Sequence, residues 1–407
     1  MYNIKKIRQD FPMLKQRMQN HPLVFLDNAS TTFKPKAVID AINNYYTKET
    51  SNSHRGDYDL CFHMDQELDA TRQLVAKFIN AKKEEIVFTS GASMSINLVA
   101  YGYAMKHLKK DDEILLTEAE HASNVLPWFK VKEVTGAKVK FIPLTKEGRL
   151  TLENVKKSIT SKTKIIAVAQ ISNVLGYLSP IKEICKLAHQ KKIIVVVDGA
   201  QSVPHRVTDV KDLDVDFLSF SAHKMCGPTG IGVLYGKHEL LKKTDPTLTG
   251  GGMNVDFYTD GKVTYFDPPA RFEAGTLNLE GVYGLKAAIK YLTSIGMNNI
   301  EKHEQELRAY LIKELKKIKD VVIYNEHAES GIVTINKKNV FAQDEATYLN
   351  SRGIAVRSGQ HCAKILNGFL NTPATVRISL YLYTSKEDID QLVKALKEGD
   401  YLNAYFA

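Results

Sequence analysis

The sequence has few cysteines and no long apolar run. The chain of 407 residues contains only four cysteines, Cys61, Cys185, Cys226 and Cys362, and no CxxC pair. We therefore expect neither a disulfide framework nor a metal site, since His361 beside Cys362 has no second pair at ligand spacing. No apolar stretch reaches the roughly 18 to 20 residues of a membrane-spanning helix. Residues 1–12 carry charges and lack the apolar core of a signal peptide, so a cytoplasmic location is expected.

The sequence also lacks a concentrated basic segment. Its formal net charge is +9 at pH 7, but the lysine pairs are spread along the whole chain. No basic run is interleaved with aromatic residues, as a stacking surface for nucleic acid would be. The distribution favours solvated surface lysines, and we expect no nucleic-acid partner.

Short apolar runs alternate with helical stretches between residues 86 and 236. Several runs are almost continuously apolar and β-branched, such as Ile193 to Val197, which is typical of strands covered on both faces. Strands separated by helices pair in parallel through right-handed crossovers. The runs lie at 86–88, 113–116, 139–143, 164–171, 193–197, 217–220 and 230–235. The pattern predicts an α/β domain with a seven-stranded, mostly parallel sheet.

A second, smaller domain is predicted toward the C-terminus. A break near residues 250–252 and 268–269 is followed by one apolar helix face, made of Leu307, Tyr310, Leu311, Leu315 and Ile318. Short strand-like runs then occur at 321–324, 331–335, 354–357 and 376–380. We expect an N-terminal arm over residues 1–20 that packs on the small domain, a large domain over 21–295 and a small α+β domain over 296–407.

Polar residues directly follow the predicted strands. Ligands of open α/β sheets bind outside the carboxyl ends of the strands, and Asp198 and Lys224 follow two of them. The pair is either a structural ion pair or a Schiff-base lysine of pyridoxal 5′-phosphate, with the aspartate keeping the cofactor's ring nitrogen protonated. Gly91-Ala92-Ser93 precedes a helical stretch whose amides would hold a phosphate, which favours the cofactor.

Six segments resemble those of SUF-type, or group II, cysteine desulfurases, which are class V aminotransferase-like enzymes of the type I fold of pyridoxal-phosphate enzymes. They run in family order from residue 26 toward the last helix. The segments are 26–32 (LDNASTT), 172–176 (SNVLG), 198–201 (DGAQ), 219–230 (SFSAHKMCGPTG), 271–276 (RFEAGT) and 357–363 (RSGQHCA). The last is the most discriminating, because it resembles the active-cysteine segment of this group alone.

The resemblance implies cofactor-binding roles for the matching residues. Lys224 would hold the cofactor and shuttle the proton, Asp198 would pair with the ring nitrogen, and His121 would stack on the ring. Gln201 would bond the ring's phenolic oxygen, and Asn173 would lie beside the cofactor on the substrate side. Ser93, Ser221 and His223, with the Gly91-Ala92 turn, would hold the phosphate. Gly275 and Thr276 would reach over from a partner subunit, which implies a homodimer with shared active sites.

Further roles concern the substrate and the sulfur. Arg377 would clamp the substrate carboxylate bidentately, with Arg357 and Asn28 nearby. Cys362 lies between Arg357 and Lys364 with His361 beside it, and nearby positive charge favours the reactive thiolate. A lone cysteine is otherwise usually a small buried hydrophobic residue, and we interpret the other three cysteines in that way.

Several positions depart from the usual family pattern. Ala92 and Ser93 stand where two threonines are common, which removes one hydroxyl. Met94, Tyr58 and Thr384 replace a usual glutamate, histidine and asparagine. These departures leave the predicted chemistry in place and concern partner choice and the dimer interface.

The predicted reaction converts L-cysteine to L-alanine. It leaves a persulfide on Cys362, which an acceptor protein of the SUF system would remove for iron–sulfur cluster assembly. The alternatives are a selenocysteine lyase or cysteine-sulfinate enzyme on the same scaffold, a non-catalytic sulfur carrier or assembly subunit, and an aminotransferase. Lys224, Asp198 and Arg377 favour an enzyme over a carrier, and the Cys362 segment favours a desulfurase over an aminotransferase.

Overall fold

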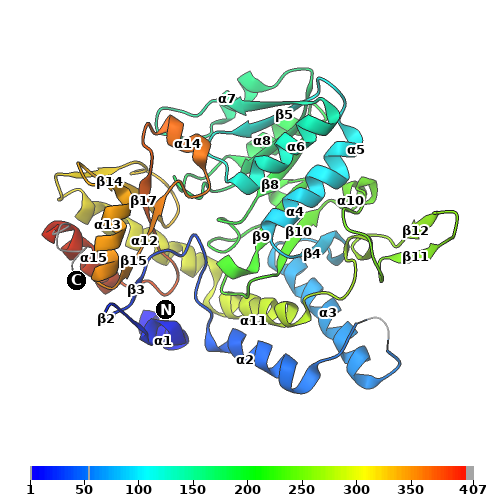
Figure 1. Ribbon diagram of the computed structural model, residues 1–407, viewed down its shortest axis with the longest axis horizontal. Helices are drawn as coiled ribbons and strands as arrows, with labels where there is room; N and C mark the ends of the chain where they lie inside the picture. The colour runs from blue at the N-terminus through cyan, green and yellow to red at the C-terminus, as the bar shows by residue number, and fades with distance from the viewer. Residues whose placement is uncertain (1, 54–55, 400–407) are drawn as a thin grey trace.

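The largest sheet has seven strands in the order β4-β10-β9-β8-β7-β5-β6, and β10 runs antiparallel to its two neighbours. The computed structural model describes residues 2–53 and 56–399 (Figure 1). The strands are β4 (Ile86–Thr89), β5 (Glu113–Thr117), β6 (Lys138–Ile142), β7 (Thr163–Ala169), β8 (Ile194–Asp198), β9 (Phe217–Ser221) and β10 (Gly232–Gly236). The predicted, mostly parallel α/β sheet is confirmed, with strand ends within two residues of those expected.

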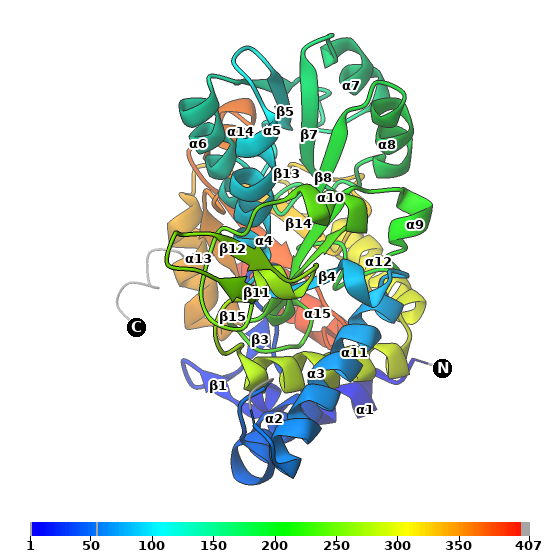
Figure 2. The ribbon, with the colours of Figure 1, turned by 90° about the vertical axis from the view of Figure 1, so that its right-hand side faces the viewer.

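Helices cover both faces of this sheet, which explains its apolar strands (Figure 2). Val195 and Val197 pack in one core with α3, α8 and α11, whereas Val196 between them packs in the opposite core with α4 and α6. The helices of this region are α2 (Lys36–Asn44), α3 (Asp59–Phe78), α4 (Ala92–Leu98), α5 (Met105–His107), α6 (Leu126–Thr135), α7 (Leu152–Ser158), α8 (Ile181–His189), α9 (Val210–Leu213), α10 (His238–Lys243) and α11 (Leu279–Ile295). In the part of the chain described, no helix has the length and hydropathy to cross a membrane.

A four-stranded antiparallel sheet lies in the C-terminal part. Its order is β13 (Val321–Ile323), β14 (Ile332–Lys337), β17 (Thr375–Ser379) and β16 (Arg357–Gly359). The accompanying helices are α12 (Met297–Leu315), α13 (Ala342–Ser351), α14 (Lys364–Phe369) and α15 (Lys386–Glu398). The prediction of a single strand at 354–357 is wrong. β15 (Ile354–Ala355) does not belong to this sheet and pairs in parallel with β3 (Val24–Phe25).

The N-terminal segment connects both parts of the molecule. Arg8 in α1 (Ile4–Gln9) forms a 2.6 Å ion pair with Asp388 of α15, and Phe11 packs in the core beneath the large sheet. Val24 and Leu26 instead belong to the core of the C-terminal sheet. The domain boundaries at residues 20 and 295 stay predictions, and residues 400–407 of the last domain lie outside the described residues.

A buried ion pair anchors the segment that leads to Gly275 and Thr276. The two terminal nitrogens of Arg72 in α3 each donate to a carboxylate oxygen of Glu273 at 2.7 Å. The amide of Phe88 in β4 also donates to Glu273, at 2.8 Å. Because both charged side chains are buried, this bidentate contact ties a helix, a strand and the 270–276 segment together.

We expect Glu273→Ala to lower the free energy of unfolding by about 3 to 5 kcal/mol, because it leaves the Arg72 guanidinium buried without its counter-ion. Urea unfolding followed by circular dichroism measures the change. Asp69→Ala is the matched control, since its 2.8 Å pair with Lys83 is exposed and should contribute less than about 1 kcal/mol. Equal losses in the two variants would contradict this account.

Candidate active site

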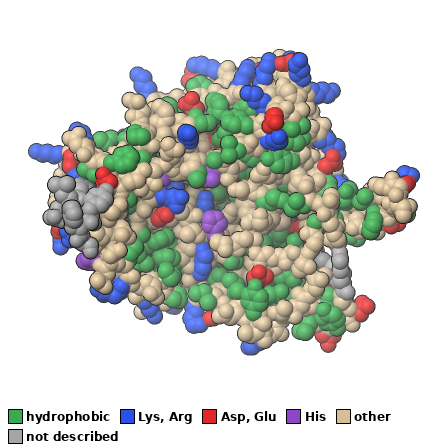
Figure 3. Space-filling model, in the orientation of Figure 1, with side chains coloured by type: hydrophobic (Ala, Val, Ile, Leu, Met, Phe, Trp, Pro, Cys, Tyr) green, Lys and Arg blue, Asp and Glu red, His purple; other side chains and the backbone are tan. Residues whose placement is uncertain are grey.

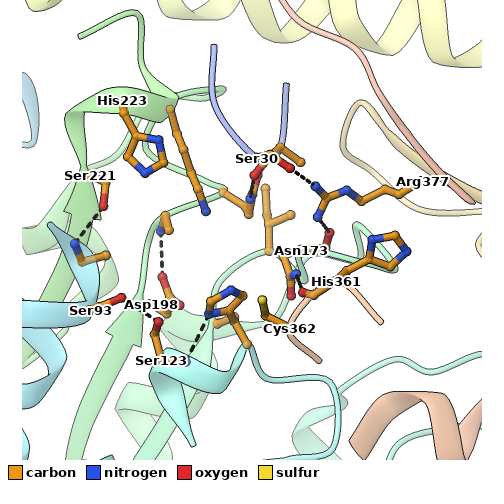
Figure 4. Close-up of a pocket in the computed structure, with 18 of the residues that line it drawn as sticks. Ser30, Ser93, Ser123, Asn173, Asp198, Ser221, His223, His361, Cys362 and Arg377 are labelled. Carbon is orange, nitrogen blue, oxygen red and sulfur yellow. Dashed lines mark hydrogen bonds between the residues drawn. The ribbon is translucent and has the colours of Figure 1, made fainter. Parts of the chain in front are cut away.

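A cavity of about 250 Å³ opens at the carboxyl ends of β7, β8 and β9 (Figure 4). Histidine side chains lie near the centre of the face shown in Figure 3, with lysine and arginine side chains beside them as well as around its edge. The lining residues come from eight separate parts of the chain. They are Ala29, Ser30, Ala92, Ser93, His121, Ser123, Ala169, Ile171, Asn173, Asp198, Ala200, Gln201, Ser221, His223, Lys224, Arg357, His361, Cys362 and Arg377.

Asp198 and Lys224 lie on neighbouring strand ends, as the sequence predicted. Asp198 closes β8 opposite Ser219 of β9, and Lys224 ends the 3₁₀-helix η6 (Ala222–Lys224) that follows β9. Desolvation lowers the pKa of Lys224 to about 8, although the charge of Asp198 opposes this shift. Among the described residues Asp198 and Lys224 form no direct ion pair. This speaks against the alternative that they are only a structural ion pair. A fraction of the Lys224 amine is therefore neutral and nucleophilic near neutral pH.

The turn that carries Lys224 is fastened to the 31–34 segment. The carbonyl of His223 accepts hydrogen bonds from the Thr32 amide at 3.0 Å and from Lys34 Nζ at 3.0 Å, and the Cys226 amide donates to Thr32 Oγ1 at 2.9 Å. Desolvation, followed by the charges of Lys224 and Lys34, lowers the pKa of His223 to about 4. The His223 ring is therefore neutral at pH 7.

Hydroxyl and amide groups gather at the start of α4. The Ala92 amide donates to Ser221 Oγ at 2.8 Å, and the hydroxyls of Ser93 and Ser123 are 2.6 Å apart. Gly91 does not line the cavity, but its φ of +154° is one that L side chains rarely adopt. Glycine therefore allows the sharp turn between β4 and α4.

His121 precedes the 3₁₀-helix η5 (Ala122–Asn124) and faces the cavity. Its Nδ1 accepts from the Ser123 amide at 3.1 Å. Desolvation and then the charge of Lys224 lower its pKa, so the neutral ring carries its proton on Nε2. Behind it, buried Glu120 accepts from Thr117 Oγ1 at 2.6 Å and from the Ala169 amide at 2.8 Å. The sequence prediction did not single out Glu120, although it adjoins His121 after the same strand.

Cys362 lies on a loop that is tied to the cavity wall on two sides. Its carbonyl accepts from the Ala122 amide at 2.7 Å, and the carbonyl of His361 accepts from Asn173 Nδ2 at 2.9 Å. Both His361 and Cys362 have left-handed φ values, +51° and +54°. Of the four cysteines, Cys362 is exposed and the other three are buried. The backbone contacts therefore hold an exposed thiol at the edge of the cavity.

His361 lies beside Cys362 in the sequence but adds no positive charge there. His361 is buried, its Nε2 lies 2.9 Å from Thr375 Oγ1, and desolvation followed by the charge of Arg377 lowers its pKa to about 3. The ring is therefore neutral at pH 7. The cationic side chains that line the cavity with Cys362 are Arg357, Arg377 and Lys224.

Arg377 of β17 joins three parts of the cavity wall. It donates to the Asn173 carbonyl at 2.9 Å, to Ser30 Oγ at 2.7 Å and to Asp27 Oδ1 at 3.1 Å. Arg357 lies 3.9 Å from the other Asp27 oxygen, and its side chain is 47% exposed. Asp27, which the sequence prediction quoted only within a segment, thus neutralises part of this positive charge.

Four buried polar atoms of the lining residues have no hydrogen-bond partner within the described residues. They are Asn173 Oδ1, Gln201 Oε1, His361 Nδ1 and Arg377 Nε. An unsatisfied buried polar group costs about 1 to 3 kcal/mol. These residues line one cavity, which favours a polar ligand there, and the Arg377 cation favours an anionic group. The His361 ring, however, points away from the cavity (Figure 4). Across the described residues, no cluster of three His, Cys, Asp or Glu side chains could hold a metal ion.

Besides Gly91, which adjoins the cavity through Ala92, three predicted site residues are not part of its lining. Asn28 is buried and donates to the Ser379 carbonyl at 2.7 Å. Gly275 and Thr276 line a separate hollow with Asn52. Their assigned roles toward substrate or cofactor stay predictions.

Comparison with known proteins gives a consistent result. The family model for aminotransferase class-V matches residues 24–392. The chain is 45% identical to a probable cysteine desulfurase of Halalkalibacterium halodurans, over 97% of this chain and 98% of that one. Its structure is similar to that of the cysteine desulfurase CsdA from Escherichia coli, with a TM-score of 0.92, 37% identity and 99% of both chains covered. A cysteine desulfurase from Thermococcus onnurineus gives a TM-score of 0.90 at 38% identity, with 95% of this chain and 98% of that chain covered.

We expect iodoacetamide at pH 8 to modify Cys362 first in the folded protein. Cys61, Cys185 and Cys226 are buried, and desolvation raises the pKa of Cys226 to about 12, which removes its reactive thiolate. Peptide mass spectrometry after graded exposure measures the order of labelling. Labelling in urea, where all four cysteines should react, is the control, and early modification of Cys226 in the folded protein would refute the prediction.

Proposed function

The chain belongs to the aminotransferase class-V family, and from this premise we propose that it is a cysteine desulfurase that uses pyridoxal 5′-phosphate. The observation that carries the proposal is a single cavity lined by Lys224, Asp198, Arg377 and Cys362. Lys224 and Asp198 suit the cofactor. Arg377 suits an amino-acid carboxylate, and Cys362 suits sulfur transfer. Similarity to cysteine desulfurases over nearly the whole chain supports the same conclusion.

The lining residues fit this cofactor. When bound, pyridoxal phosphate supplies an aldehyde that condenses with amines and a ring that withdraws electrons from the neighbouring carbon. The Lys224 amine would hold the cofactor and would accept the α-proton of the substrate, a task suited to a pKa of about 8. Asp198 would supply the negative charge that keeps the cofactor's ring nitrogen protonated. Gln201 Nε2 donates one hydrogen to the Ala29 carbonyl at 2.7 Å, so its second Nε2 hydrogen would remain for the ring's phenolic oxygen.

Arg377 orients the substrate through its carboxylate. Its Nε has no partner in the described part of the chain, and its Nη atoms are already fixed by Asn173, Ser30 and Asp27. The guanidinium is therefore held in place before substrate arrives, so little side-chain entropy is lost on binding. Arg357, more exposed, adds positive charge at the same side.

Cys362 carries out the sulfur step. Its thiolate attacks the substrate sulfur, so that an S–S bond forms on the protein while the substrate's Cβ–S bond breaks and its electron pair stays with carbon. Protonation of that carbon fragment, followed by release, gives L-alanine and leaves a persulfide on Cys362. The cationic side chains of Arg357 and Arg377 line the same cavity as this thiol.

The persulfide then passes to a thiol of an acceptor protein for iron–sulfur cluster assembly. The exposed position of Cys362 supports this transfer, because a partner can reach it without unfolding the cavity. The resemblance to SUF-type enzymes makes a SUF acceptor the proposed partner, and a cytoplasmic location stays a prediction from the sequence.

A homodimer completes the proposal. The hairpin of β11 (Asn254–Phe257) and β12 (Val263–Tyr265) projects from the body of the molecule in Figure 1. It exposes apolar side chains, with Phe257 70% and Val255 60% exposed, which favours a partner surface. Thr276 lies in a hollow that this segment flanks, consistent with a role in the neighbouring subunit's site.

We expect light scattering to give twice the chain mass of 45.7 kDa. Phe257→Asp together with Val255→Asp should weaken the dimer, because both changes place a charge in an apolar contact. Tyr46→Asp is a control at an exposed aromatic residue on another element. A monomeric wild-type protein at micromolar concentration would contradict the dimer.

Cys362→Ser separates the two halves of the reaction. The variant should bind cofactor and change its absorbance with L-cysteine, since Lys224 and Asp198 remain. It should make almost no alanine, because a serine hydroxyl is a poor nucleophile at neutral pH and cannot store a persulfide. Alanine and sulfide are measured together with L-cysteine, with and without reductant, and Lys224→Ala is the control that should lose both cofactor attachment and turnover. Full alanine production by Cys362→Ser would remove Cys362 from the mechanism.

Arg377→Lys tests the carboxylate clamp. An ammonium group cannot reproduce the forked contact, and a lost charge-assisted hydrogen bond costs roughly 1.5 to 3 kcal/mol. We therefore expect kcat/KM for L-cysteine to fall about 10- to 150-fold. The matched change Arg357→Lys, at the more exposed arginine, should cost less. A larger fall in kcat/KM for Arg357→Lys than for Arg377→Lys would show that Arg357 binds the substrate carboxylate.

A further inference from the structure

Two serines from different elements meet at one wall of the cavity. Ser93 lies in the first turn of α4 and Ser123 in η5, and both line the cavity. Their hydroxyl oxygens are 2.6 Å apart (Figure 4), so one hydroxyl donates to the other. The Ser123 amide also donates to His121 Nδ1 at 3.1 Å. Ser123 therefore contacts both His121, through its backbone amide, and Ser93, through its hydroxyl.

Either serine can be the donor in this contact, and the two directions leave different hydrogens free for a ligand. Each serine has one O–H hydrogen, so the serine that accepts keeps its hydrogen for another group. Ser221 Oγ already accepts from the Ala92 amide and thus also keeps its hydrogen for a ligand. If Ser123 donates, the hydrogens of Ser93 and Ser221 both remain for an anion at the start of α4. A hydrogen bond received by Ser93 also strengthens the one that it donates.

Few other side chains can supply donors at this end of the cavity. Ala92 has no hydroxyl, and the neutral ring of His223 has a single N–H donor. The Ser93 side chain is exposed, so packing does not fix its rotamer and a hydrogen-bond partner is needed to do so. The Ser123 hydroxyl supplies that contact from a neighbouring element.

We propose that Ser123 is a positioning residue for the phosphate of the cofactor, because it donates to Ser93 Oγ and thereby orients the Ser93 hydroxyl toward that phosphate. This inference rests on the proposed function, since it requires pyridoxal phosphate in the cavity.

The test is equilibrium titration of apoprotein with pyridoxal phosphate, followed by absorbance. Ser123→Ala should raise the dissociation constant roughly 5- to 10-fold, as the loss of one neutral hydrogen bond implies. Ser93→Ala should raise it roughly 10- to 100-fold, because a bond to a charged phosphate is stronger. The double variant should equal Ser93→Ala alone, since Ser123 acts through Ser93. Ser123→Thr, which keeps the hydroxyl, should restore wild-type affinity.

Two controls separate this role from a structural one. Titration with pyridoxal, which lacks the phosphate, should give the same dissociation constant for wild type and Ser123→Ala, because the His121 contact uses only the Ser123 backbone. Ser95→Ala removes a hydroxyl pair in the same helix, 2.8 Å from Thr89 Oγ1 but outside the cavity lining, and should leave affinity unchanged.

An unchanged dissociation constant for Ser123→Ala would overturn the inference, as would losses that multiply in the double variant, because Ser123 would then act independently of Ser93. An equal loss with pyridoxal would also overturn it, by locating the effect at the ring. Failure of wild-type apoprotein to bind pyridoxal phosphate would instead overturn the proposed function itself.

Discussion

The arrangement of the site depends on one buried guanidinium. Arg377 stands on the C-terminal sheet, yet its hydrogen bonds reach the loop after β7 through Asn173 and the N-terminal segment through Ser30 and Asp27. A buried cation is stable only when paired and hydrogen-bonded. Asp27 supplies the charge, and the carbonyl and hydroxyl supply the remaining bonds. The same contacts that make the charge tolerable therefore hold three separate segments around one cavity and leave Nε for a ligand.

Desolvation divides the nitrogen-containing side chains of the cavity into two groups. It lowers the pKa of Lys224, His121, His223 and His361, so the histidines are neutral at pH 7 and the lysine is partly neutral. The arginines stay cationic because the guanidinium is too basic to lose its proton. The cavity thus combines a nucleophilic amine and neutral rings with fixed positive charge, which suits a reaction that must bind an anion and transfer protons.

The thiol of Cys362 is placed by backbone contacts rather than by packing. Its carbonyl is bonded to the Ala122 amide, and the preceding carbonyl to Asn173, so two loops of the large sheet hold the cysteine loop. Because no buried side-chain contact is needed, the thiol remains exposed while its position is still defined. This combination is what a sulfur carrier at an active site requires: proximity to the substrate and access for an acceptor.

The sequence by itself determined the large sheet and the residues at its strand ends. Continuous β-branched runs report burial on both faces, and Asp198 and Lys224 follow those runs directly, so their meeting at one edge was predictable from local pattern. The tertiary structure alone decided the contacts between distant segments: the parallel pairing of β15 with β3, the Asp27–Arg377 pair and the Ser93–Ser123 contact. It also decided that His361 is neutral, because protonation depends on burial and on charges brought close by folding. Local periodicity specifies elements, whereas desolvation and hydrogen-bond partners arise only when elements far apart in the chain pack together.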